Sequence, residues 1–161
     1  MNRSLTVALK YGLFITACLI AYFLILRLFG LHDSVWLRLA NGLFMAVGIF
    51  FAIKYYKFKY NAGFTYVDGF KTGLLTGFIA TGCFVIFMAI YMFHLDKSFA
   101  QDILAEWFGD SNQGPGLLIL ILVMEGLAST AVLTLTCMQI FKKSQHVGQQ
   151  EELFDKKSEK R

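Results

Sequence analysis

Long apolar runs separated by short polar segments dominate this chain. A bilayer core of about 30 Å needs roughly 20 consecutive apolar residues per spanning helix. Four windows meet that requirement: residues 11–29, 35–53, 72–93 and 117–141. Helix is the expected state of each, because a strand exposed to lipid leaves its backbone donors unpaired. The pattern predicts an all-α fold, a four-transmembrane-helix bundle over residues 1–143, followed by a polar cytoplasmic tail over 144–161.

Composition supports this assignment. The chain is 57% hydrophobic and 16% aromatic, more than the core of a small soluble domain can bury. Its net charge of +4 raises the question of nucleic-acid binding. The Lys and Arg residues flank apolar runs instead of interleaving with aromatic residues on a soluble face, so we expect the lipid bilayer as partner and no nucleic acid.

The distribution of basic residues predicts the orientation, because positively charged loops stay in the cytoplasm. One set of segments carries Arg3, Lys10, Lys54, Lys57, Lys59, Lys71, Lys142, Lys143, Lys156, Lys157, Lys160 and Arg161. The opposite set carries only Arg27, Arg38 and Lys97. Both termini and the middle loop are therefore predicted to be cytoplasmic.

The middle loop, residues 55–66, mixes tyrosines and lysines around an Asn-Ala-Gly turn. Tyrosine rings favour the headgroup zone, and lysines there meet anionic lipid. The segment is interpreted as an anchoring belt, and a lipid-headgroup site is the alternative.

The loop between the third and fourth windows has apolar residues at helical spacing: Leu95, Phe99, Ile103, Leu104, Trp107 and Phe108. Asp102 and Glu106 fall on the other face, so we predict a short outer amphipathic helix. We expect it to lie on the membrane surface, with a lid or a partner-binding helix as alternatives.

Glu125 is the one acidic residue inside a predicted span, where an ionisable group costs about 3 kcal/mol or more. Four polar residues are expected at a similar depth: Tyr22, Arg38, Asn41 and Ser129. Together they form a candidate intramembrane polar cluster. We expect it to provide an interhelical hydrogen bond or ion pair, to present a carboxylate to the outer water, or to be the protonatable site of a small proton- or cation-coupled transporter.

Small residues indicate where helices approach closely. Gly69, Gly73 and Gly77 recur every four residues at the start of the third span, and Gly42 and Gly126 lie in the second and fourth. Such spacing is typical of packed transmembrane helices. The partner helix is either in the same chain or in another subunit.

No pattern in the sequence points to an enzyme, a metal or a cofactor. His32 and His94 fall at helix ends without metal-ligand spacing. The cysteines lie in apolar windows and are interpreted as packed thiols. Residues 15–18 match a lipobox, but the apolar run continues to Leu26, which argues against processing at Cys18.

Residues 10–13 (KYGL) and above all 63–76 (GFTYVDGFKTGLLT) resemble a family of four-helix bacterial membrane proteins, found mainly in Bacteroidota and catalogued as a domain of unknown function. The resemblance covers nearly the whole chain to Lys143. It implies an inner-membrane location and no known activity or site. The predicted role is a structural or accessory subunit, in a homo-oligomer or a larger membrane complex, and the alternative is a transporter that uses Glu125.

Overall fold

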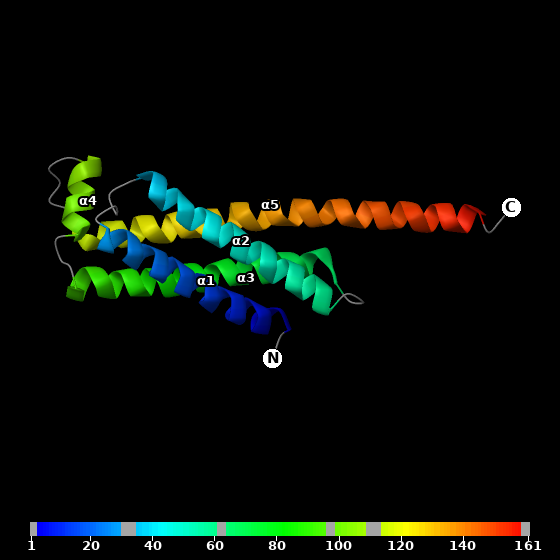
Figure 1. Ribbon diagram of the computed structural model, residues 1–161, viewed down its shortest axis with the longest axis horizontal. Helices are drawn as coiled ribbons and strands as arrows, with labels where there is room; N and C mark the ends of the chain where they lie inside the picture. Colours follow the sequence, from blue (N-terminus) through cyan, green and yellow to red (C-terminus); the bar gives the residue numbers. More distant parts are fainter. Residues whose placement is uncertain (1–2, 30–34, 61–63, 96–98, 109–113, 159–161) are drawn as a thin grey trace.

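The computed structural model describes residues 3–29, 35–60, 64–95, 99–108 and 114–158. All regular elements in these ranges are helical: α1 (Arg3–Leu28), α2 (Val35–Lys59), α3 (Tyr66–Ile90), the π-helical turn η2 (Tyr91–Leu95), α4 (Phe99–Phe108) and α5 (Pro115–Ser158). The four long helices form one bundle, and α4 lies across one end of it (Figure 1).

Three of the described helical segments are long and apolar enough to cross a membrane, namely Arg3–Leu28, Tyr66–Leu95 and Pro115–Phe141. They indicate a multi-pass membrane protein, as predicted. α2 is as long as α3, at 25 residues, and packs against all three of these segments.

Three of the four long helices begin before their apolar windows, and α2 begins with its window at Val35. α3 starts at Tyr66 instead of residue 72, because Thr65 has an extended backbone (φ −101°, ψ 148°). The Thr65 hydroxyl donates a hydrogen bond of 2.7 Å to Asp68 Oδ2. Asp68 lies in the first turn, where a negative charge stabilises the positive end of the helix dipole. Polar side chains in the first turn thus accompany the start of the helix, and hydropathy does not register them.

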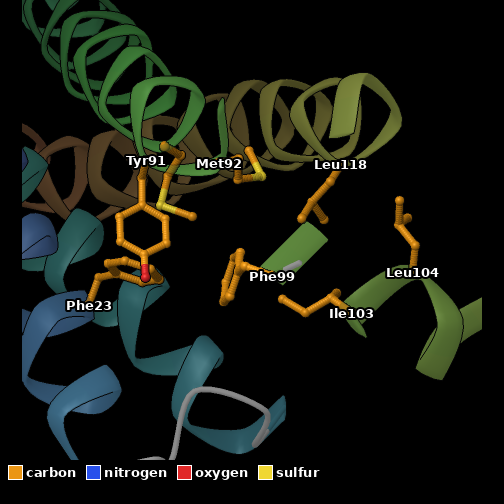
Figure 2. Close-up of a cluster of buried hydrophobic side chains, with 8 residues drawn as sticks. Phe23, Tyr91, Met92, Phe99, Ile103, Leu104 and Leu118 are labelled. Carbon is orange, nitrogen blue, oxygen red and sulfur yellow. The ribbon is translucent and has the colours of Figure 1, made fainter. Parts of the chain in front are cut away.

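Two hydrophobic clusters fill the bundle. The first joins the four long helices through Ile15, Leu19, Met45, Ile49, Ile53, Ala80, Cys137 and Met138. The second lies under α4 and consists of Phe23, Met88, Tyr91, Met92, Phe99, Ile103, Leu104 and Leu118 (Figure 2). Cys137 is a buried free thiol within the first cluster.

A short helix is present at the predicted place, as α4, and its position relative to a membrane stays a prediction. Phe99, Ile103 and Leu104 are only 5%, 6% and 0% exposed because they pack on the end of the bundle. Figure 2 shows the Phe99 and Ile103 side chains directed toward the bundle, near Tyr91 and Leu118. The side chains of Asp102, Glu106, Trp107 and Phe108 lie outside the described part of the structure.

The predicted polar tail is a continuation of the last helix. α5 is a single helix of 44 residues that runs through Ser158. Its C-terminal half extends beyond the other helices (Figure 1).

Candidate functional site

A cavity of about 190 Å³ lies in the half of the bundle nearest α4. Every helix contributes to its wall: Leu19, Tyr22, Phe23, Leu26, Asn41, Gly42, Met45, Thr81, Phe84, Val85, Met88, Phe99, Ile103, Leu118, Leu122, Glu125, Gly126 and Ser129. An apolar protein cavity of about 150 Å³ is enough to hold benzene. This cavity therefore has room for several waters or for a small organic group.

Four members of the predicted polar cluster line this one cavity. Tyr22 comes from α1, Asn41 from α2, and Glu125 and Ser129 from successive turns of α5. The side chain of the fifth member, Arg38, lies outside the described part of the structure. The assignment of a function to these residues stays a prediction.

The polar groups occupy different depths in the cavity. Glu125 is exposed on the bundle surface as well as lining the cavity, so it lies at the mouth. Thr81 is only 7% exposed. The buried Thr81 Oγ1 and Asn41 Oδ1 atoms have no hydrogen-bond partner among the described residues. A buried polar atom left unsatisfied costs about 1–3 kcal/mol, so both atoms can gain a hydrogen bond from whatever fills the cavity.

α4 closes the end of the cavity through Phe99 and Ile103. The Phe99 ring meets the Phe23 and Tyr91 rings edge to face, with centroids 5.8 and 5.6 Å apart. The Arg27 guanidinium carbon lies 4.9 Å from the Tyr91 ring centroid and 5.8 Å from that of Phe99. Edge-to-face and cation–π contacts of this kind stabilise α4 in its place over the bundle.

The predicted packing glycines of α3 face α5. Their contacts form an antiparallel series: each contact lies four residues further toward the C-terminus of α3 and four residues further toward the N-terminus of α5. We call this series the glycine–threonine row, and its pairs are Gly73 with Thr134, Gly77 with Thr130, and Gly126 with Thr81. Gly69 continues the row against Met138. The partner helix, which the sequence left open, is here in the same chain.

Gly42 differs from the other predicted packing glycines. A β-carbon there would meet no described atom within 4 Å, because Gly42 borders the cavity. On the same helix, a β-carbon on Gly48 would overlap Ile15 of α1. Gly12 of α1 plays a similar role against α3, where the Thr76 carbonyl oxygen would lie 3.1 Å from an added β-carbon.

Sequence reasoning missed Thr130 and Thr134 of the row. Thr130 and Thr134 are fully buried, and their Oγ1 atoms have no hydrogen-bond partner within the described ranges. Elsewhere in the bundle, Thr16, Thr72 and Thr76 donate to the carbonyl oxygen four residues earlier. The four-residue spacing of residues 126, 130 and 134 was the signal that could have revealed this face of α5.

The described part of the chain holds no group of three His, Cys, Asp or Glu side chains placed to bind a metal ion. His94 is exposed at the end of η2, and His32 lies outside the described residues. The predicted absence of a cofactor stays a prediction.

Comparison with known proteins identifies a matching family but no individual protein that matches. No curated protein and no solved structure matches the chain. A family whose description is "protein of unknown function (DUF4199)" matches residues 10–143, from α1 through the candidate span of α5. The chain therefore belongs to the DUF4199 family.

Proposed function

We propose that this chain is a four-span protein of a bacterial inner membrane, with both termini in the cytoplasm, and that it serves as a structural or accessory subunit. It packs with a second copy or with another membrane protein. The Bacteroidota origin is part of the proposal, and its support is the resemblance of residues 63–76 quoted above.

The position of the basic side chains supports the topology. Arg3 and Lys10 lie near the start of α1, Lys57 and Lys59 at the end of α2, and Lys71 near the start of α3. These three helix ends lie together at the end of the bundle opposite α4 (Figure 1). Basic residues are retained in the cytoplasm, so helix ends rich in Lys and Arg are expected on the same side of the membrane. For all three basic ends to lie on that side, α2 has to cross the membrane.

The support for a partner-binding role is an outward apolar stripe on α2, because the small-residue face of α3 is already used inside the chain. The glycine–threonine row joins α3 to α5, so association with a partner has to use another face. On α2, Leu43, Val47 and Phe51 recur every four residues and are 65%, 47% and 50% exposed. This outward stripe is the surface we assign to a membrane partner. Transport through Glu125 gains no support from the described residues and is not proposed.

Reporter fusions test the topology. A reporter fused behind Arg161, or inserted at residues 61–63, is expected to respond as a cytoplasmic protein, and one inserted at residues 30–34 as a periplasmic protein. A periplasmic signal from the C-terminal fusion would contradict the proposal.

Mass measurement of the intact assembly, after extraction in a gentle detergent, tests the role. We expect a second copy or a stoichiometric second protein. Alanine at Leu43, Val47 and Phe51 together should release that partner, while alanine at the exposed α1 residues Leu13, Phe14 and Ile25 should not. A monomeric wild-type chain, or equal release by both variants, would overturn the assigned role.

A further inference from the structure

The end of the bundle opposite α4 holds a set of cations arranged around tyrosine rings. Lys10 Nζ and Lys59 Nζ each lie 5.6 Å from the centroid of the Tyr55 ring. Lys59 Nζ also lies 5.7 Å from the centroid of Tyr60, and the Arg3 guanidinium carbon lies 5.4 Å from it. Three cations from two helices are thus held around two rings. We call Arg3, Lys10, Tyr55, Lys59 and Tyr60 the basic-aromatic cluster.

The two rings are themselves held by other aromatic side chains. Tyr55 of α2 packs against Tyr11 of α1, with ring centroids 5.6 Å apart. Tyr60 packs against Tyr56, with centroids 5.0 Å apart, and Tyr56 is only 6% exposed. Because the rings are positioned in this way, the cations above them lose less conformational freedom when they bind a ligand.

The three cations are exposed, and no described carboxylate forms an ion pair with any of them. Like charges gathered at one place repel one another, and an anion bound between them removes that repulsion. Ammonium and guanidinium groups supply only hydrogen-bond donors, and the guanidinium fork matches the oxygens of a phosphate. The cluster therefore has the chemistry of a phosphate site.

The source of the phosphate follows from the place of the cluster in the fold. Tyr55 and Tyr60 lie at the end of α2, next to the start of the candidate span of α1, and tyrosines at the ends of spans favour the lipid headgroup zone. A lipid brings its phosphate to this depth, whereas a free anion has to leave bulk water. We propose that the basic-aromatic cluster binds the phosphate headgroup of an anionic phospholipid. The proposed topology decides which leaflet of the membrane supplies the lipid. The binding of the lipid by the cluster does not depend on that topology.

Lipid titration monitored by native mass spectrometry tests the proposal on the full chain in a neutral detergent. Phosphatidylglycerol is the anionic probe, and phosphatidylcholine is the zwitterionic one. Each basic residue near an anionic headgroup strengthens binding roughly 5-fold, so glutamine at Arg3, Lys10 and Lys59 together should weaken phosphatidylglycerol binding on the order of 100-fold.

A matched control removes the same charge from the same end of the protein. Glutamine at Lys54, Lys57 and Lys71, which lie outside the cluster, should change the affinity by less than about 5-fold. Equal weakening by both triple variants would overturn the site, since it would mean that only the overall charge matters. Equal affinity of the wild-type chain for the two lipids would overturn it as well.

Two further measurements test whether binding depends on the tyrosine rings and on the lipid, and not only on the charge of the cluster. Leucine at Tyr55 and Tyr60 keeps every cation and should weaken phosphatidylglycerol binding by about 10-fold, because the cations lose their support. Unchanged binding in that variant would contradict the role of the rings. Glycerol phosphate should compete poorly with the lipid, and competition at equal concentration would show a free-anion site in place of a lipid site. None of these results depends on which side of the membrane the cluster faces, so failure here is distinct from failure of the topology.

Discussion

Gly77 of α3 and Thr130 of α5 lie so close together that a β-carbon on residue 77 would stand 2.6 Å from the threonine Oγ1. No ordinary side chain fits this space, so glycine sets the distance between the two helix axes. The same relationship recurs one turn away at Gly73 and Thr134. The contact between α3 and α5 is thus defined by backbone approach, as expected where lipid gives no hydrophobic force between helices.

Alanine at Gly77 should destabilise the bundle by about 1–3 kcal/mol, because the added methyl group overlaps Thr130. The measurement is the free energy of unfolding from a denaturant titration in detergent micelles. Gly82→Ala on the same helix is the control. A β-carbon there meets no described atom within 4 Å, so this change should stabilise the chain by up to about 1 kcal/mol through helix propensity. Equal effects of the two substitutions would contradict the close approach.

Valine at Thr130 should leave stability unchanged or raise it by about 1–3 kcal/mol. The Thr130 hydroxyl is buried, and no described residue accepts or donates a hydrogen bond to it, so its removal abolishes a desolvation cost. Thermal unfolding compared with Thr136→Val provides the measurement. Thr136 is exposed and donates to the Val132 carbonyl oxygen at 2.9 Å, so its replacement should be close to neutral. A loss above about 1 kcal/mol in Thr130→Val would mean that the hydroxyl has a bonding partner.

Gly42 and Gly48 of α2 should respond to alanine in opposite directions. At Gly42 a methyl group enters open space beside the cavity, so helix propensity should add about 0.5–1 kcal/mol of stability. At Gly48 the methyl group overlaps the buried Ile15, and a loss of about 1–3 kcal/mol is expected. Both values come from the same unfolding titration. Destabilisation by Gly42→Ala would show that this part of the cavity wall is filled.

Alanine at Phe99 should release α4 from the bundle. The side chain is 5% exposed and contacts the rings of Phe23 and Tyr91, so its removal should cost about 3–5 kcal/mol of local stability. Amide hydrogen exchange measures this loss of local stability: exchange should become faster across α4 and change little in α3. Gln101→Ala, at an exposed position on the same helix, is the control and should leave exchange in α4 nearly unchanged. Normal protection of α4 in Phe99→Ala would show that other contacts hold it.

Hydropathy predicted the helical architecture because apolar length reflects the thickness of the bilayer. It did not predict where α3 begins, since Thr65 and Asp68 at its start are polar and interact with each other through a hydrogen bond. The helical period of Phe99 and Ile103 predicted α4 as well. The period identifies an apolar face but carries no information about what covers it, because lipid and protein both accept phenylalanine and isoleucine.

Residue numbers place side chains by depth, because each residue of a helix rises 1.5 Å. Tyr22, Asn41 and Glu125 were grouped on that basis, and the structure lines one cavity with them. Rotation about each helix axis is fixed only by packing with a neighbour. The sequence therefore gave no means to pair Gly126 with Thr81, or to separate Gly42 from Gly48.

The unbroken course of α5 has a mechanical consequence. From Phe141, where its candidate span ends, the same helix continues to Ser158, a distance of roughly 25 Å at 1.5 Å per residue. A continuous helix is stiff, so the packing of α5 against α3 in the glycine–threonine row sets the direction in which this extension leaves the bundle. Any protein that contacts the far end of the extension does so several helical turns away from the bundle.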